Sequence, residues 1–553
     1  MNTAYAQSQP KLTEAQRIAF DGHYINANKF LMLKMPDEAL KELKQAAVID
    51  ANAAVNYLFA KIYFEKRVYH DAEQYALKSV LLDKENSWYA KQLCEIYREQ
   101  KKYVQAADVY AKLYRNGEKT TTNLFDATYM YVMGRELDKA IKLLNEAEKE
   151  LGVNEDIIRQ KQSIYLAQRK TDKAIKEVEK LIKAYPQSTK YRGLLADIYL
   201  SMGKEEKAND LYRKILEMEP DNGSALLALA DDFRNKKQLK EWFEYTQKAI
   251  ASKQLDIKSK LRATVDFITS NLFGDEHKEK CYQLIDVFTI TNPDEASAWM
   301  LKGDVYAQNT KYETARESYS RAAELEPSNY TTWRQLVLCD IETKNYVAME
   351  KDCGSAIELF PTESLFFVYH AIASQQLKNY EVCLKVAWQG VEISSDQEQI
   401  LLQLYLIIGD VNDKLKNFDK SDSAYQLALK LEPNNSLTLN NYAYQLSLRN
   451  TNLDKAEQMS KRSLELEKDN PSYLDTYGWI LFMRQKYEEA KVQIEKALLL
   501  EPGNAEVTDH FGDVLFKLGK IEEALEQWKK AKALGLESII LEKKIKDKKW
   551  YDH

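Results

Sequence analysis

The hydrophobic and small residues between positions 299 and 327 follow the spacing of two short amphipathic helices joined by a polar turn. They fall at steps of three and four residues on either side of the turn at 308–311, and such steps place side chains on one face of a helix. The last of them is a proline, which has no amide hydrogen and ends the second helix. Small residues stand where the two helix axes come closest, and aromatic residues fill the space beside them. These positions are Trp299, Gly303, Tyr306, Ala315, Tyr319, Ala322 and Pro327.

The two-helix pattern returns along the chain with a period of mostly 34 residues, for example at Trp333, Ala356 and Pro361. A helix pair of this size cannot bury its apolar face alone, so neighbouring pairs must stack. Small residues open the second helices at Ala39, Ala72, Ala106, Ala140, Ala174, Ala208, Ala315, Ser421, Ala456, Ala490 and Ala524. Prolines close the units at Pro186, Pro220, Pro293, Pro327, Pro361, Pro433 and Pro502.

Fifteen units can be counted from these anchors. They begin at residues 20, 53, 87, 121, 155, 189, 223, 262, 296, 330, 364, 402, 436, 471 and 505. Two intervals exceed the period, from 223 to 262 and from 364 to 402. We expect lengthened connections there, at 251–261 and 394–397. Two interpretations remain open, a bend of the stack and a loop insertion without a mechanical role.

The pattern resembles the tetratricopeptide repeat family over residues 20–538. The seven positions between 299 and 327 match the family motif, and most of it recurs at Gly478, Ala490, Ala497 and Pro502. The resemblance implies an all-α, right-handed superhelical solenoid of about fifteen two-helix units. Some positions depart from the motif, so the units that contain them are expected to be distorted; these are Trp242, Thr269 and Cys281.

We expect the chain to be organised in five parts. Residues 1–19 form a flexible N-terminus, 20–261 units one to seven, 262–401 units eight to eleven, 402–538 units twelve to fifteen, and 539–553 a C-terminal capping helix. An open-ended stack needs a cap with a polar outer face. The lysines of that helix are therefore expected to face solvent, while the last unit is covered by Ile539, Leu541, Ile545 and Trp550.

Composition narrows the function classes. Lys and Arg number 79 against 85 Asp and Glu, a net charge of -6 that disfavours a nucleic-acid binder relying on phosphate contacts. No run of 18 apolar residues is present, so no transmembrane segment is predicted. The cysteines lack Cys-x-x-Cys spacing and most occupy packing positions of the repeat, so we interpret them as buried packing residues. They are Cys94, Cys281, Cys339, Cys353 and Cys383.

No catalytic pattern is found along the chain. Motifs of nucleophilic serine hydrolases, dinucleotide and phosphate-binding loops, zinc proteases and calcium loops are all missing. The glycines are isolated, with Gly303, Gly409, Gly478 and Gly512 at the close helix contact and Gly203 and Gly519 in turns. The six histidines are too scattered for a metal site. We therefore predict a non-enzymatic protein without cofactor or metal.

The candidate partner-binding residues lie on the first helices. The family resemblance implies that these helices line the concave face, which holds an extended peptide or a partner's helix. An acidic stripe there would select a partner with basic segments. Solubility and local capping are the other interpretation of the same carboxylates. Core packing is the other interpretation of the nearby aromatic residues Phe482 and Phe516. The candidates are Asp197, Asp231, Asp304, Asp410, Asp475, Trp479, Asp509 and Asp513.

Two functional hypotheses follow. In the first, the chain is an interaction scaffold working in envelope assembly, exported to the periplasm or cell envelope of a Gram-negative bacterium. Its last three units are similar to the C-terminal ends of exported tetratricopeptide proteins. Ala4 and Ala6 also match the end of a secretory signal peptide, although a disordered Ala-containing tail explains them too. In the second, the chain is a cytoplasmic adaptor or regulator that gathers signalling or enzyme partners.

Overall fold

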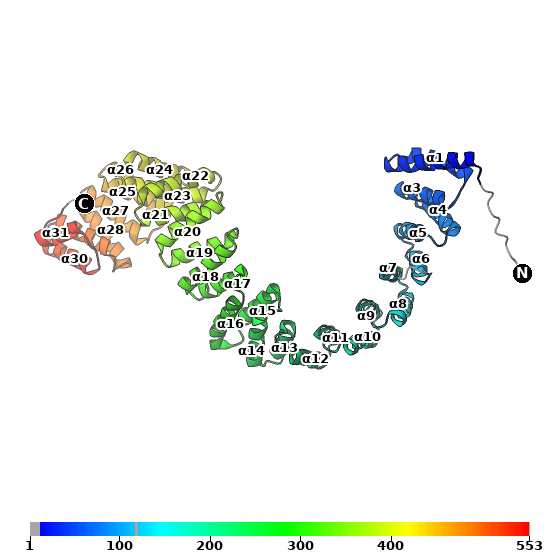
Figure 1. Cartoon of the computed structure of the whole chain (residues 1–553). Helices are drawn as coiled ribbons and strands as arrows, with labels where there is room; N and C mark the ends of the chain where they lie inside the picture. The colour runs from blue at the N-terminus through cyan, green and yellow to red at the C-terminus, as the bar shows by residue number, and fades with distance from the viewer. Residues whose placement is uncertain (1–11, 117–119, 552–553) are drawn as a thin grey trace. The chain divides into compact units, whose positions relative to one another are not determined.

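The three-dimensional structure is a computed structural model that describes residues 12–116 and 120–551. Over these residues the chain forms the α-helices α1 to α31, one short 3-10 helix and no strand. Figure 1 shows the helices following one another in chain order, each beside its neighbours in sequence. The predicted fold class, an all-α superhelical solenoid of two-helix units, is therefore confirmed.

The chain divides into two compact units, Met1–Ile257 and Lys258–His553. The first contains seven successive helix pairs within its described residues. They are α1 (Glu14–Met32), α2 (Pro36–Ile49), α3 (Ala53–Glu65), α4 (Tyr69–Leu82), α5 (Ser87–Glu99), α6 (Tyr103–Asn116), α7 (Thr121–Met133), α8 (Leu137–Leu151), α9 (Glu155–Ala167), α10 (Thr171–Ala184), α11 (Thr189–Ser201), α12 (Glu205–Met218), α13 (Gly223–Asn235) and α14 (Leu239–Ala251).

The second unit continues the same architecture and ends in one additional helix. It contains α15 (Ile257–Ser270), η1 (Gly274–Glu276), α16 (His277–Thr291), α17 (Ala296–Ala307), α18 (Tyr312–Leu325), α19 (Tyr330–Glu342), α20 (Tyr346–Leu359), α21 (Ser364–Gln376), α22 (Tyr380–Ile393), α23 (Glu398–Lys414), α24 (Phe418–Leu431), α25 (Ser436–Leu448), α26 (Leu453–Leu466), α27 (Pro471–Met483), α28 (Tyr487–Leu500), α29 (Ala505–Lys517), α30 (Ile521–Ala533) and α31 (Ile539–Asp547).

Short sequence signals begin and turn the helices. Asparagines cap many first helices; Asn504, for example, accepts a hydrogen bond from the backbone amide of Val507 at 3.2 Å. The turn inside each pair contains a residue with positive φ, which is Lys, Arg or Gly in most pairs. Gly203 and Gly519 occupy this position with φ of 68° and 81°, so their predicted place in turns is confirmed.

Glycines in the first helices allow the second helices to approach closely. A Cβ atom on Gly303 would lie 2.4 Å from the ring of Tyr319, and one on Gly512 would lie 2.5 Å from Trp528. Gly409 and Gly478 face similarly close neighbours. The aromatic rings therefore fill the volume that a side chain would need, as the repeat pattern predicted.

The predicted register agrees with most observed first helices, and three of them begin earlier. α1 starts at Glu14 rather than residue 20, because Thr13 and Gln16 form a capping box. α15 starts at Ile257, so the connection after α14 is limited to 252–256, and part of the extra length lies between α15 and α16. α23 starts at Glu398 and has 17 residues, so the chain there gains a helical turn instead of a longer loop at 394–397.

Candidate partner-binding surface

Four candidate aspartates that directly follow the small residue of a first helix are hydrogen-bonded within their own helix pair. The Tyr319 hydroxyl donates to Asp304 Oδ1 at 2.7 Å, across 15 residues of sequence. The same contact recurs at the same separation in the pairs Tyr212–Asp197, Tyr425–Asp410 and Trp528–Asp513. One carboxylate oxygen in each pair thus joins the first helix to the second.

These aspartates differ in how far they reach solvent. Asp197 on α11 and Asp231 on α13 are exposed, whereas Asp304 and Asp410 are half-buried. Burial raises the pKa of Asp304, and it raises the pKa of Asp410 to about 6 despite the hydrogen bond from Tyr425. The exposed carboxylates among the predicted partner contacts are therefore those of α11 and α13.

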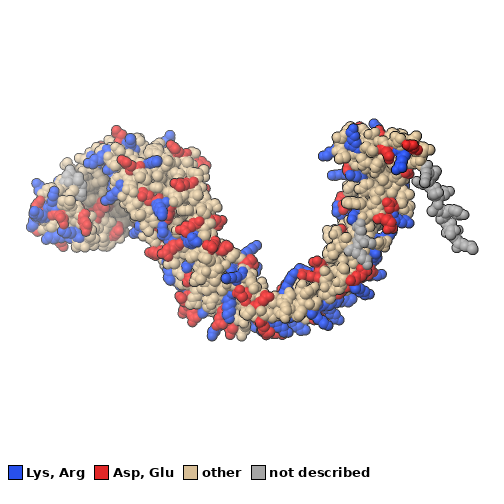
Figure 2. Space-filling model, viewed as in Figure 1, with Lys and Arg blue, Asp and Glu red and all other residues tan. Residues whose placement is uncertain are grey.

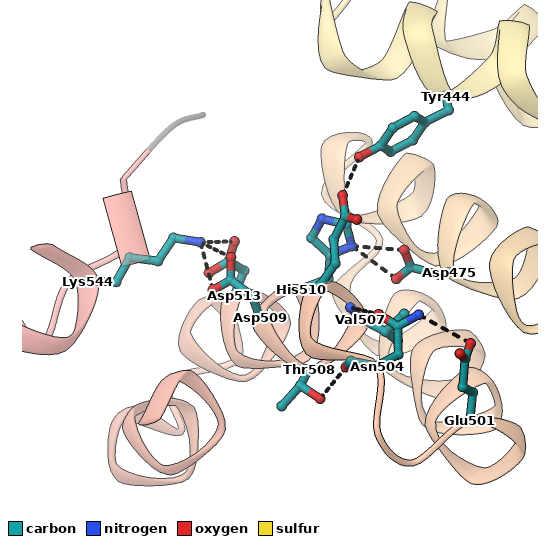
Figure 3. A network of polar contacts seen from close by, with 11 residues as sticks. Tyr444, Asp475, Glu501, Asn504, Val507, Thr508, Asp509, His510, Asp513 and Lys544 are labelled. Atoms are coloured by element: carbon teal, nitrogen blue, oxygen red, sulfur yellow. Dashed lines mark hydrogen bonds and ion pairs between the residues drawn. The ribbon is translucent and has the colours of Figure 1, made fainter. Parts of the chain in front are cut away.

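A buried ion pair joins α27 to α29 near the C-terminal end (Figure 3). His510 Nδ1 lies 3.0 Å from each carboxylate oxygen of Asp475, and the ring of Trp479 stacks on the imidazole at 4.3 Å between centroids. Burial by itself lowers the pKa of His510, but the charge and hydrogen bond of Asp475 outweigh it and raise that pKa to about 9. The imidazole is therefore charged at neutral pH.

A second buried ion pair joins α29 to α31 (Figure 3). Lys544 Nζ lies 2.7 Å from Asp513 Oδ2 and 3.1 Å from Asp509 Oδ2, and the lysine side chain has no exposed surface. Burial and the neighbouring charge of Asp513 raise the pKa of Asp509. The prediction that the lysines of the capping helix face solvent is wrong for Lys544, because its ammonium group neutralises two carboxylates inside the protein.

The remaining contact of this region spans two helix pairs. The Tyr444 hydroxyl on α25 donates to Glu506 Oε1 on α29 at 3.1 Å (Figure 3). A cavity of about 220 Å³ lies beside this contact and is lined in part by Asp509 and His510. Polar contacts thus connect the first helices α25, α27 and α29 with α31.

The structure gives four predicted contacts internal partners instead of an open surface. Asp475, Trp479, Asp509 and Asp513 are all buried, and the three carboxylates contact residues of other helices instead of capping their own helix or facing solvent. The ionic partners that complete the cluster, His510 and Lys544, were missed by the sequence analysis. His510 stands 35 residues after Asp475, and Lys544 stands 35 residues after Asp509, so pairs of opposite charge about one repeat apart were the available signal.

The capping helix α31 ends at Asp547, so it is shorter than the predicted 539–553, and Trp550 follows it in the chain. Leu541 is buried, and Ile545 and Trp550 are half-buried against the last pairs. Ile539, in contrast, is 76% exposed, because it lies at the start of α31 beyond the covered face. The apolar face of the last helix pair is therefore covered by the middle of α31, where Leu541 and Ile545 lie.

The cysteines are buried and free, as predicted. Burial raises the pKa of Cys281 to about 11 and that of Cys339 to about 12, so these thiols stay protonated and inert. Within the described part of the chain, no group of three or more His, Cys, Asp or Glu residues is placed to hold a metal ion. Among the same residues, no helix combines the length and apolar character needed to cross a bilayer.

Charges of both signs are spread over the surface. Figure 2 shows Lys and Arg interspersed with Asp and Glu along both units on the viewed face. A continuous basic surface of the kind that tracks a nucleic-acid backbone is not seen on this face.

Family models for the tetratricopeptide repeat match residues 163–225, 296–329 and 402–435. The chain contains tetratricopeptide repeats. The segment from 296 to 329 covers the helix pair α17 and α18, whereas the other two segments begin inside α9 and α23. The unit from 296 to 329 is the one whose spacing defined the pattern.

A human protein named N-alpha-acetyltransferase 16, NatA auxiliary subunit, is 25% identical to the chain over 119 residues. This alignment covers 22% of the chain and 14% of the human protein. The similarity is therefore confined to a small part of a much longer relative.

Several solved structures share the helical architecture. A structure of Naa15/Naa10 bound to HypK-THB covers 97% of this chain and 91% of its own, with 14% identity and a TM-score of 0.38. The crystal structure of the APC/C hetero-tetramer Cut9-Hcn1 covers 90% of this chain and 96% of its own, with 15% identity and a TM-score of 0.31. The crystal structure of yeast Tom70 covers 76% of this chain and 93% of its own, with 18% identity and a TM-score of 0.34. At these scores the superpositions say nothing about function.

Proposed function

We propose that this protein is a non-catalytic scaffold that binds protein partners along the surface formed by its first helices. The observation that carries the proposal is the pair Asp197 and Asp231. Both side chains are exposed, and they occupy equivalent positions on the successive first helices α11 and α13. Repeats of this kind stack so that equivalent positions form a continuous binding surface.

The spacing of the two carboxylates suggests the chemistry of the partner. The two carboxylates recur one repeat apart, on the successive first helices α11 and α13. A partner with Lys or Arg residues at a matching distance would place one cation at each aspartate. Because both carboxylates are exposed, this recognition is expected to weaken as salt is added.

The other candidate residues take different roles in this proposal. Asp475, Trp479, Asp509 and Asp513 hold the C-terminal helices together and leave partner binding to other positions. Asp304 and Asp410 are secondary contacts, because both are half-buried, whereas Asp197 and Asp231 are exposed.

The test is charge reversal on the first helices. Partners are first identified by affinity capture from native cells with the full chain, and the dissociation constant of the most abundant one is then measured. Asp197→Lys combined with Asp231→Lys should weaken binding about tenfold. The matched control reverses Glu179 and Asp210, exposed carboxylates on the second helices α10 and α12. Equal effects of the two double variants would contradict binding by the first helices.

A second candidate function is an adaptor that accompanies an enzyme in the cytoplasm. It is favoured by the local similarity to a protein named as an auxiliary subunit of NatA. Co-purification of an enzyme whose activity changes on removal of this protein would support it. Capture of partners without any enzyme would argue against it.

A role in envelope assembly, with export to the periplasm or envelope, is supported only by the sequence. The cue at Ala4 and Ala6 lies outside the described residues. Fractionation of native cells with an antibody to the chain distinguishes the two locations. The genomic sequence upstream of Met1 gives an independent test, since an in-frame basic and apolar stretch would support export.

A further inference from the structure

An apolar groove of about 600 Å³ lies between the second helices α2 and α4 of the first unit. Its floor contains Val55 and Phe59 of α3, which are almost fully buried. Its walls carry Val48 of α2 and Leu81 of α4, which are 84% and 69% exposed. Aliphatic side chains that stay in water around an apolar floor mark a surface that gains free energy when it is covered.

The charges lining the groove have a single sign. Lys44 on α2 and Lys78 on α4 line it from opposite walls, and no acidic residue lines it. Neither lysine pairs with a carboxylate within residues 12–116 and 120–551. The ammonium group of Lys78 lies 5.1 Å from the ring centroid of Tyr75, which also lines the groove. The groove therefore presents an apolar floor between two cations without anionic partners.

We propose that this groove binds an amphipathic helix of a partner protein, with the apolar face of that helix on the floor and its flanking carboxylates at Lys44 and Lys78. The lining residues belong to helices whose interior backbone groups are already hydrogen-bonded. An extended segment would leave its own backbone groups without partners there, whereas a helix satisfies them itself. A helix also fits between two helices by packing its ridges into their grooves.

Other occupants fit the groove less well. Residues 1–11 contain no Asp or Glu, so that segment cannot supply the carboxylates. A nucleic acid would gain from the two lysines but not from the apolar floor. The proposal is independent of the first-helix surface, because it involves α2 and α4 and different side chains.

The probe is a synthetic helical peptide of about 18 residues, long enough for several turns. It carries a leucine stripe at helical spacing with glutamates on both flanks, and its counterpart carries lysines in place of the glutamates. Binding to the full chain is measured by fluorescence anisotropy. The acidic peptide should bind at least about tenfold more tightly than the basic one, because charge complementarity sets partner choice.

Two sets of variants test the groove itself. Lys44→Glu with Lys78→Glu should weaken binding of the acidic peptide about tenfold, and Leu81→Asp should do the same by placing a charge in the apolar wall. These side chains are exposed, so the fold should tolerate the changes. The control is Lys112→Glu with Lys142→Glu, exposed lysines of α6 and α8 that do not line the groove. It should leave binding unchanged.

Three results would overturn the proposal. The first is equal affinity for the acidic and basic peptides. The second is loss of peptide binding in Asp197→Lys with Asp231→Lys but not in the groove variants, which would place the peptide on the first helices. The third is sedimentation showing self-association of the wild type that Lys44→Glu with Lys78→Glu abolishes, which would make a second copy the occupant.

Discussion

The ammonium group of Lys544 lies 2.7 Å from Oδ2 of Asp513 in the interior of the second unit. The same group contacts Asp509 at 3.1 Å, so one cation neutralises two carboxylates of α29. Removing one partner from such a cluster leaves a buried charge without compensation, which is far more costly than losing a surface ion pair. α31 is therefore held to the stack by charge as well as by its apolar residues.

Lys544→Met is expected to loosen the C-terminal end. The substitution keeps most of the side-chain volume and removes the charge, and the expected loss of stability is about 3–5 kcal/mol. Faster hydrogen exchange in α29 and α31 measures it locally. Lys546→Met, an exposed lysine of the same helix, is the control. Unchanged exchange in both variants would show that the apolar contacts suffice.

His510 should make stability depend on alkaline pH. Its pKa of about 9 in the folded protein lies above the value of about 6.5 expected for an unfolded chain. The stabilisation is therefore fully present below pH 6.5 and is lost as the pH rises through 9, by about 3 kcal/mol. The protection of α27 and α29 against hydrogen exchange should fall as the pH rises from 6.5 through 9 in the wild type. It should stay constant in His510→Gln. His70→Gln, at an exposed site, should behave as the wild type.

Asp410 should also make stability fall as the pH rises, but in the acidic range. Its folded pKa of about 6 lies above the unfolded value of about 3.9, so the folded state binds the proton more tightly and stability falls as pH rises from 4 to 6. Asp410→Asn removes the buried charge and keeps an acceptor for Tyr425. The variant should be more stable than the wild type by about 2 kcal/mol at pH 7.5 and equal to it at pH 4. Hydrogen exchange of α23 and α24 at the two pH values checks this; a constant difference would contradict it.

Gly303 and Gly193 form a matched pair of glycines within helices. Gly303→Ala places a Cβ 2.4 Å from the ring of Tyr319 and should cost about 1–3 kcal/mol. Gly193→Ala meets its nearest neighbour, Ile215, at 4.0 Å, and should stabilise by about 0.5–1 kcal/mol through the helix preference of alanine. Thermal unfolding of each variant shows whether its melting temperature rises or falls. Equal shifts of the melting temperature in the two variants would contradict the close-contact explanation.

The repeat register was predictable because it depends on local chemistry. The starts at 53, 87 and 121 agree with α3, α5 and α7, since small residues, turn residues and helix breakers act over a few positions. The first residues of α1, α15 and α23 were predicted less well. Inserted residues can enter a loop or extend a helix, and the choice depends on packing against neighbouring pairs.

The sequence by itself determined the architecture of this protein, because a 34-residue period of small, aromatic and proline residues admits one way of burying its apolar faces. It also determined which positions carry acidic side chains. Only the tertiary structure decided which of those side chains are available to a partner. Asp197 remains in solvent, whereas Asp513 is covered by α31, a helix that joins the stack after the last repeat. The physical reason is that burial and charge pairing depend on contacts between residues far apart in sequence, which no local pattern specifies.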